Sequence, residues 1–291
     1  MLPATGAWEE FDMKKRILST AILWTILVAI LECFGMFGCL ILLIAASALT
    51  QWEFYKLAQL AGYKPFAMLG IACGIAMQLQ CWHSHSHVAN AGESLIMAAT
   101  IVACCTLTKR SVTAIRESLV PTLLGIAYVP FTFTFSVIFA DEMRILCEIP
   151  MTAALHTLLL LVAIAKFNDV GGIIFGRAFG KRKLAPDFSP NKTLEGLIGG
   201  VISSIAIGIA IFATCKQFLV PGFTLPHTIL LSALVSLMAV VGDLIESAIK
   251  RMARVKDSGR ILPGIGGIFD LTDSLILALP IGIAYVKYII V

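Results

Sequence analysis

Charged residues are scarce in this 291-residue chain. They make up 14% of the sequence, whereas a soluble domain carries about 25%. Hydrophobic residues make up 58%, and apolar stretches of roughly 15 to 25 residues recur along the whole length. No stretch alternates with the short period of a membrane barrel. The composition therefore excludes a soluble domain and predicts an all-α, polytopic integral membrane protein.

Several other features are missing. The eight cysteines form no CxxC pair and no metal-ligand spacing, so we interpret them as small buried hydrophobic residues rather than a redox or zinc site. No linker rich in Pro or Ser, low-complexity tract or internal repeat interrupts the chain, which predicts a single transmembrane domain over residues 1–291. After Lys14, Lys15 and Arg16 the apolar run is too long for a cleavable signal peptide and lacks a small-residue cleavage site.

The apolar stretches predict nine membrane spans. The first two form one apolar run of about 33 residues, which is too long for a single crossing, so we expect a tight reversal around Gly35 and Gly38. The predicted spans are 17–33, 34–50, 66–80, 93–107, 118–139, 151–166, 196–214, 226–242 and 273–290.

The positions of the basic residues predict the orientation. With the N-terminus in the cytoplasm, all of the 22 Lys and Arg residues except Arg144, Lys216 and Lys287 fall on the cytoplasmic side. The two longest cytoplasmic segments, 167–195 and 243–272, both follow residue 150. We therefore expect residues 1–150 to form an N-terminal helical bundle part and residues 151–291 to form the catalytic part.

The eighth span continues into a polar stretch, "GDLIESAIKRMARVKD". If the helix continues past Gly242, one face carries acidic groups at membrane depth and basic groups further out. These residues are Asp243, Glu246, Ser247, Lys250 and Arg254. A solvated helical face with a Glu246–Lys250 pair is the simpler alternative. Asp243 directly follows an apolar run, however, and carboxylates at that depth usually line a polar cavity.

The next stretch, "KDSGRILPGIGG", contains too many glycines for a regular helix and allows backbone N–H groups to approach a ligand. It leads into "FDLTDS", where Asp270 and Asp273 lie one turn apart. Asp270 alone could be a helix cap, but a second carboxylate a turn later is not needed for capping. With Asp243, this pair could hold a divalent cation such as Mg2+, which takes oxygen ligands.

The other cytoplasmic segment, "KFNDVGGIIFGRAFGKRKLAPDFSPNKTLEG", combines glycines with basic residues. We expect turns at Gly171, Gly172, Gly176 and Gly180, and a helix capped by Ser189. Lys181, Arg182 and Lys183 could simply set the topology or touch anionic lipids, whereas Lys192 is a better phosphate-binding candidate. Acidic metal ligands beside basic residues suit phosphoryl or nucleotidyl transfer.

Two blocks of the sequence resemble the CDP-diacylglycerol synthase (phosphatidate cytidylyltransferase) family. The C-terminal signature of that family has the form S-x-x-K-R-x4-K-D-x-G-x-x-L-P-G-H-G-G-x-x-D-R-x-D, and the upstream block resembles "FND…FGK…KLAP…SPNKT.EG". The signature residues in this chain are Ser247, Lys250, Arg251, Lys256, Asp257, Gly259, Leu262, Pro263, Gly264, Gly266, Gly267, Asp270 and Asp273. Together the blocks cover about a third of the chain.

The resemblance implies that CTP and phosphatidate react to give CDP-diacylglycerol and pyrophosphate, with Mg2+ as cofactor, no nucleic-acid partner, and a possible homodimer. It implies metal binding by Asp243, Asp270 and Asp273, and catalytic roles for Asp243, Asp270 and Lys256. The implied substrate-binding residues are Lys192, Ser247, Lys250, Arg251, Asp257, Gly266 and Gly267. Apart from the resemblance, the compactness of the chain suggests a bacterial inner membrane, with membrane lipids as surroundings, and the basic residues put the active site on its cytoplasmic face.

Two positions depart from the signature: Ile265 replaces its histidine and Leu271 replaces its arginine. Both changes remove donors that could contact phosphate. A catalytically weakened homologue that binds nucleotide or anionic lipid as a regulator is therefore a second hypothesis. A transporter is a third, because intramembrane carboxylates also bind coupling ions.

Overall fold

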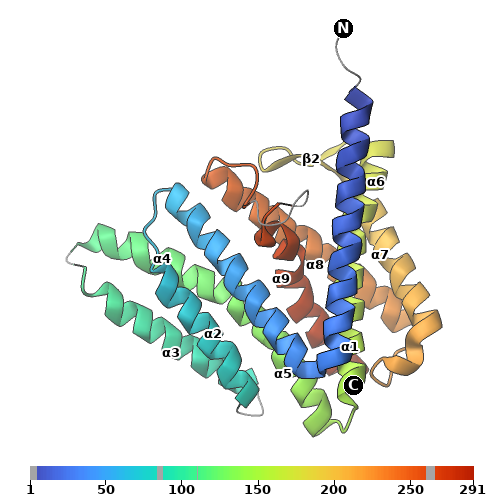
Figure 1. Cartoon of the computed structure of the whole chain (residues 1–291), viewed down its shortest axis with the longest axis horizontal. Helices are drawn as coiled ribbons and strands as arrows, with labels where there is room; N and C mark the ends of the chain where they lie inside the picture. Colours follow the sequence, from blue (N-terminus) through green and yellow to red (C-terminus); the bar gives the residue numbers. More distant parts are fainter. Residues whose placement is uncertain (1–4, 84–87, 110, 260–265) are drawn as a thin grey trace.

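The computed structural model describes residues 5–83, 88–109, 111–259 and 266–291. Within these ranges the chain is almost entirely helical (Figure 1). The α-helices are α1 (Thr5–Leu60), α2 (Ala67–His83), α3 (Val88–Thr106), α4 (Val112–Tyr128), α5 (Pro130–Leu146), α6 (Met151–Phe179), α7 (Leu194–Cys215), α8 (Leu225–Met252) and α9 (Ile268–Tyr285). Short helical turns follow α7 (Lys216–Phe218) and α9 (Val286–Ile290), and the strands are β1 (Lys183–Ala185) and β2 (Ser189–Thr193).

Six helical segments among the described residues are long and apolar enough to cross a membrane, which agrees with the prediction of an all-α membrane protein. They are Trp24–Leu60, Val112–Ile145, Met151–Phe179, Leu194–Phe218, Leu225–Met252 and Ile268–Ile290. The helices α2 and α3, which correspond to the predicted spans 66–80 and 93–107, do not meet this length and hydropathy criterion.

Helix α1 is broken at Gly35, one of the two glycines at which we expected a reversal. Gly35 has a φ of +53° and a ψ of −135°, a backbone conformation that glycine adopts without a steric penalty. Figure 1 shows the two arms of α1 leaving this point at a sharp angle, like the sides of a V. The second arm continues to Leu60 and so brings ten residues beyond the predicted span into the helix.

The predicted span 118–139 consists of two helices, α4 and α5, that meet at Val129. Pro130 occupies the first position of α5, where its missing N–H group does not interrupt the helical hydrogen bonds. Val129 has a φ of −103° and a ψ of −76°, so the chain changes direction between the two helices.

Of the four glycines after Asp169 at which we expected turns, Gly180 ends helix α6 as its C-cap, whereas the other three lie within the helix. Helix α6 continues through Gly171, Gly172 and Gly176 as far as Phe179. A Cβ atom at Gly171 would lie 2.2 Å from Ser203 Oγ on α7, and one at Gly199 would lie 2.2 Å from Phe175 Cβ. These glycines therefore serve close helix packing, as small residues commonly do between membrane helices.

A β-hairpin replaces the helix start that we predicted at Ser189. Strand β2 pairs antiparallel with β1, and Ala185 lies opposite Ser189. Pro190 lies within this two-stranded hairpin, where edge positions tolerate proline. The N-cap of α7 is Thr193, whose Oγ1 accepts a hydrogen bond of 3.1 Å from the Gly196 N–H. The predicted cap was thus four residues too early.

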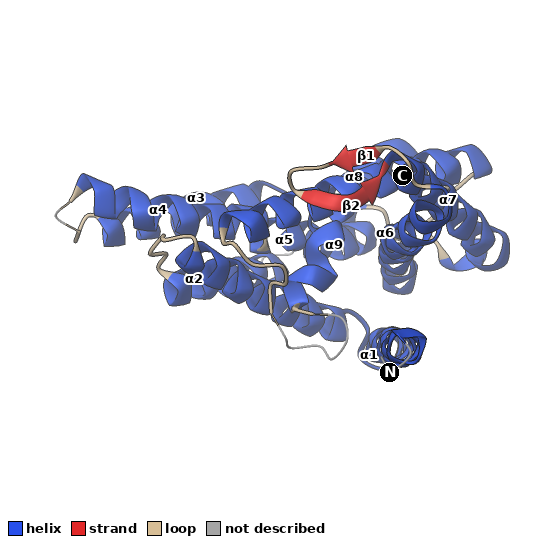
Figure 2. Ribbon diagram, turned by 90° about the horizontal axis from the view of Figure 1, so that it is seen from above, coloured by secondary structure: helices blue, strands red, loops and turns tan. Residues whose placement is uncertain are grey.

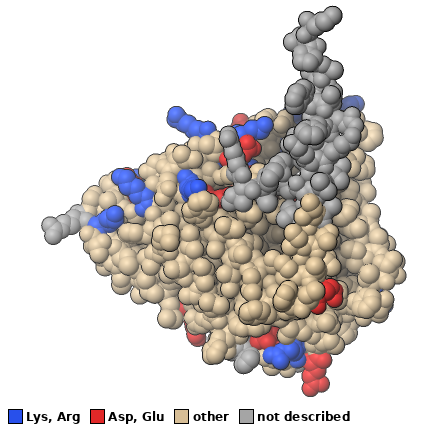
Figure 3. Space-filling model, in the orientation of Figure 1, with Lys and Arg blue, Asp and Glu red and all other residues tan. Residues whose placement is uncertain are grey.

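The start of α1 and the end of the chain lie at opposite sides of the bundle (Figure 1). The β-hairpin, the end of α8 and the start of α9 gather at the side where α1 begins. Figure 2, viewed from above, shows the hairpin lying across α8 near α6 and α7. On the face shown in Figure 3, charged side chains are concentrated at the upper and lower edges, and a broad uncharged band separates them. This distribution fits a bundle embedded in a membrane.

Candidate active site

Three carboxylates converge where α8 meets α9. Asp243, Glu246 and Asp273 each offer an oxygen, and these oxygens all lie within 4.8 Å of one another. We call these three residues the acidic cluster. Asp243 and Glu246 lie one turn apart on α8, so they share a face. Glu246 and Asp273 are buried, whereas Asp243 is half-buried.

The absence of a side chain at Gly242 allows the two helices to approach at this point. A Cβ atom there would lie 2.3 Å from the Asp273 carbonyl oxygen, which is shorter than any normal contact. The close contact between the two helices therefore lies directly before the α8 carboxylates. The glycine lets α9 bring Asp273 next to the α8 carboxylates.

Two of the predicted lysines lie beside the acidic cluster. Lys192 of β2 forms an ion pair with Asp243, and Lys250, one turn beyond Glu246 on α8, lies 2.5 Å from its Oε2 atom. Lys250 also donates to Asp270 Oδ1 at 2.8 Å. Both lysines are less than a quarter exposed, so their charges are only partly screened by water.

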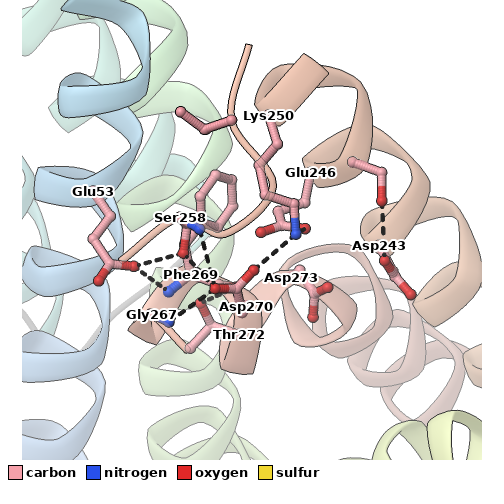
Figure 4. A network of polar contacts seen from close by, with 12 residues as sticks. Glu53, Asp243, Glu246, Lys250, Ser258, Gly267, Phe269, Asp270, Thr272 and Asp273 are labelled. Carbon is pink, nitrogen blue, oxygen red and sulfur yellow. Dashed lines mark hydrogen bonds and ion pairs between the residues drawn. The ribbon is translucent and has the colours of Figure 1, made fainter. Parts of the chain in front are cut away.

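Asp270 lies outside the acidic cluster and holds the segment before α9 (Figure 4). Its Oδ2 atom accepts hydrogen bonds from Ser258 N (3.2 Å), Ser258 Oγ (2.8 Å) and Gly267 N (2.8 Å). The Gly267 bond is the capping interaction that we considered from the sequence, at the third position of α9. Asp270 therefore both caps α9 and orients Lys250 toward Glu246.

Of the remaining predicted residues, Ser247 contacts the acidic cluster. Ser247 Oγ is 3.5 Å from Asp243 Oδ1. Arg251 Nε donates to the Phe188 carbonyl oxygen at 3.1 Å, which attaches the hairpin to α8. Lys256 and Asp257 are exposed. Gly266 has a φ of +121°, a conformation that favours glycine; Ile265 falls outside the described residues.

Gly267 allows close approach of polar side chains, and a substitution tests this contact. A Cβ atom at Gly267 would lie 2.2 Å from Ser258 Oγ and 2.3 Å from Glu53 Oε2. Gly267→Ala should therefore lower the free energy of unfolding by about 1–3 kcal/mol through overpacking, measured by thermal unfolding in detergent. Gly92→Ala is the control, because among the described residues no atom outside its own stretch of helix lies within 4 Å of its Cβ position. An equal loss of unfolding free energy in the two variants would contradict the close contact at Gly267.

Two groups beside the site were not predicted from the sequence. On α6, Lys166 Nζ donates to Ser274 Oγ at 2.7 Å and lies 3.6 Å from Asp169 Oδ2. This places a basic and an acidic residue next to the residue that follows Asp273. The second group is the carboxylate of Glu53 on α1, a residue that is 1% exposed. An isolated carboxylate after an apolar run was the only available signal for Glu53, since its partners are more than 200 residues away.

The residues of the acidic cluster fit a divalent cation. All three offer carboxylate oxygens, the ligands that Mg2+ prefers. Glu246 Oε1 is buried and has no hydrogen-bond partner among the described residues, although buried carboxylate oxygens normally have one. A cation among these oxygens would give Glu246 such a partner.

The chain is also similar in sequence to known proteins. The family model described as the cytidylyltransferase family matches residues 14–289. A phosphatidate cytidylyltransferase of Staphylococcus haemolyticus (strain JCSC1435) is 32% identical over 274 residues, covering 92% of this chain and 97% of that protein.

Two further relatives align over shorter regions. A phosphatidate cytidylyltransferase of Staphylococcus saprophyticus subsp. saprophyticus is 38% identical over 159 residues, 55% of each chain, so this chain spans about half the length of that relative. The uncharacterized protein YnbB of Escherichia coli (strain K12) is 41% identical over 130 residues, 45% of this chain and 42% of that protein.

Proposed function

We propose that the chain, which belongs to the cytidylyltransferase family, converts CTP and phosphatidate into CDP-diacylglycerol and pyrophosphate in phospholipid biosynthesis. The observation that carries this proposal is the acidic cluster of Asp243, Glu246 and Asp273 with Lys192 and Lys250 against it. Carboxylates that hold a metal beside lysines that neutralise phosphate are the groups that nucleotidyl transfer needs.

In the proposed reaction, a phosphatidate oxygen attacks the α-phosphorus of CTP, and the bond from that phosphorus to the pyrophosphate oxygen breaks. No protein nucleophile is required. Asp243, Glu246 and Asp273 would hold Mg2+, which when bound would offset negative charge on the phosphates. This set contains Glu246 in place of Asp270, the ligand that the sequence suggested, because Asp270 is engaged with Lys250, Ser258 and Gly267.

The lysines would bind and orient the substrates. Lys192 and Lys250 lie against the acidic cluster and would neutralise the phosphates at the reacting atoms. The exposed Arg251 and Lys256 would bind phosphate groups further out. The acyl chains of phosphatidate would stay in the bilayer while its phosphate meets the nucleotide at the polar end of α8.

We further propose nine crossings, with the N-terminus and the active site on the cytoplasmic face of a bacterial inner membrane. The positions of the Lys and Arg residues support this orientation. An odd number of crossings also agrees with the opposite positions of the start of α1 and the end of the chain (Figure 1). The count requires each arm of α1 to cross, α4 with α5 to cross once, and the shorter α2 and α3 to cross as well.

In this proposal, residues 1–150 support a catalytic part formed by residues 151–291 within one domain, and two copies of the chain form a homodimer. Leu271 lies in the first turn of α9, between Asp270 and Asp273. The activity does not depend on an arginine at that position in this proposal, since the carboxylates and lysines around the acidic cluster are in place.

The direct test uses purified protein in detergent with CTP, phosphatidate and Mg2+. Pyrophosphate should be released only when all three are present, and CDP-diacylglycerol should accumulate in equal amount. Folded protein that shows no turnover under these conditions would reject the proposal. If nucleotide binds without turnover, the regulator hypothesis is favoured instead.

A further inference from the structure

We propose that Glu53 is a positioning residue that fixes both ends of the glycine-rich segment, residues 255–259 and 266–270, beside the acidic cluster. The expected effect on turnover rests on the proposed function, but the positioning itself does not. Glu53 lies in the second arm of α1, in the N-terminal part of the chain, to which the sequence assigned no chemistry.

One oxygen of Glu53 binds donors from both ends of the segment. Glu53 Oε2 accepts a hydrogen bond of 2.8 Å from the Phe269 N–H, and it lies 3.0 Å from Ser258 Oγ, whose single proton it shares with Asp270 Oδ2. Phe269 lies in the first turn of α9, where backbone N–H groups have no partner within the helix. A carboxylate at that end also interacts favourably with the helix dipole.

A continuous set of polar contacts leads from Glu53 to the acidic cluster (Figure 4). The Ser258 hydroxyl lies between Glu53 Oε2 and Asp270 Oδ2, at 3.0 Å and 2.8 Å. Asp270 then contacts Lys250 at 2.8 Å, and Lys250 contacts Glu246 at 2.5 Å. The position of Glu53 is therefore linked, through three side chains, to a residue of the acidic cluster.

The backbone around Glu53 is shaped for this carboxylate. A Cβ atom at Gly259 would lie 2.2 Å from Glu53 Oε1, and one at Gly267 would lie 2.3 Å from Glu53 Oε2. Two glycines, one from each end of the segment, thus allow the carboxylate to reach the backbone. A side chain at either position would displace the Glu53 carboxylate or the segment itself.

Neighbouring residues of α1 hold the same part of α9. One turn earlier, Thr50 Oγ1 is 2.8 Å from Thr272 Oγ1. The rings of Phe54 and Phe269 meet edge to face, with centroids 6.3 Å apart. Because these contacts already join the two helices, the added contribution of Glu53 is its reach to Ser258. Burying a carboxylate is costly, and an apolar side chain at position 53 could join the two helices without that cost. The carboxylate is therefore better explained by its bond to Ser258 than by helix packing.

The experiment compares three variants by hydrogen–deuterium exchange and by kinetics. Glu53→Met removes both acceptors at similar length, and Glu53→Gln keeps one oxygen. Glu32→Gln is the matched control, because it changes a carboxylate in the other arm of the same helix, 3.1 Å from His156 Nε2. In Glu53→Met, peptides covering 255–259 and 266–270 should exchange faster, while peptides elsewhere should not change. Glu53→Gln should be intermediate, and Glu32→Gln should match the wild type.

The kinetic expectation is a fall in kcat of roughly tenfold to a hundredfold for Glu53→Met, as for residues that orient metal ligands. The KM for phosphatidate should not change, and Glu53→Gln should recover most of kcat. Wild-type exchange and turnover in Glu53→Met would overturn the proposal. Faster exchange along the whole chain would also overturn it, because Glu53 would then stabilise only the fold.

Two further outcomes are separable. If the wild type does not turn over CTP, the proposed function fails, but the exchange comparison still decides the positioning role. If Glu53→Met does not fold, Glu53→Gln is combined with Ser258→Ala. Since both substitutions weaken the Glu53–Ser258 hydrogen bond, the double variant should lower kcat by less than the product of the two single effects. Fully additive effects would overturn the proposal.

Discussion

Asp243→Asn and Asp273→Asn should each lower the rate of CDP-diacylglycerol formation by about a thousandfold. Each substitution removes a negative charge from the acidic cluster and so weakens Mg2+ binding. A metal ion stabilises transition-state charge by several kcal/mol, and a loss of about 4 kcal/mol corresponds to roughly a thousandfold in rate. The measurement is initial velocity against Mg2+ concentration in detergent with CTP and phosphatidate.

Asp187→Asn serves as the control, because Asp187 is an exposed carboxylate in the turn of the β-hairpin. It should keep wild-type turnover. Asp270→Asn separates the two proposed ligand sets: we expect a loss of roughly tenfold to a hundredfold, as for an orienting partner, with an unchanged Mg2+ requirement. Wild-type turnover in Asp273→Asn, together with a raised Mg2+ requirement in Asp270→Asn, would contradict the acidic cluster as the metal site.

Lys250→Met should destabilise the fold as well as abolish activity. Lys250 lies between Glu246 and Asp270, at 2.5 Å and 2.8 Å, and its side chain is 13% exposed. Removing one partner of a buried ion pair leaves an uncompensated charge, which costs about 3–5 kcal/mol. We expect a clearly lower midpoint of thermal unfolding in detergent, measured by tryptophan fluorescence.

The double variant Lys250→Met with Glu246→Met tests the physical reason. Replacing a buried ion pair by apolar residues of similar size is often neutral or stabilising, and Asp270 keeps its bonds from Ser258 and Gly267. The double variant should therefore recover most of the lost stability while staying inactive. A double variant less stable than Lys250→Met, or a single variant as stable as the wild type, would show that the pair does not hold the fold in this way.

The helical membrane fold could be predicted because hydropathy and the positions of charged residues depend on the local sequence alone. The break at Gly35 was also predictable, since the apolar run is too long for one span and glycine tolerates the reversal. The ends of the helices were harder to predict. Helix α6 extends 13 residues past its predicted end because Gly171 and Gly172 pack against α7, and glycine spacing alone does not distinguish a packed helix face from a turn.

The candidate site could be predicted in part. Helical spacing put Asp243 and Glu246 on one face of α8, and the structure brings Asp273 to them. The sequence did not predict that Asp273 joins the acidic cluster while Asp270 caps α9 and contacts Lys250. These roles depend on how α9 is oriented by Gly242 and Ser258. Glu53 could not be connected to the site from the sequence, since its contacts with Ser258 and Phe269 depend on tertiary packing.

The proposed reaction depends on the acidic cluster holding the metal ion, which anomalous diffraction from crystals grown with Mn2+ in place of Mg2+ would locate. We predict one peak within coordinating distance, about 2 Å, of carboxylate oxygens from Asp243, Glu246 and Asp273, with Asp270 still bound to Lys250. A peak coordinated by Asp270 without Glu246, or no peak at the junction of α8 and α9, would show that the acidic cluster is not the metal site.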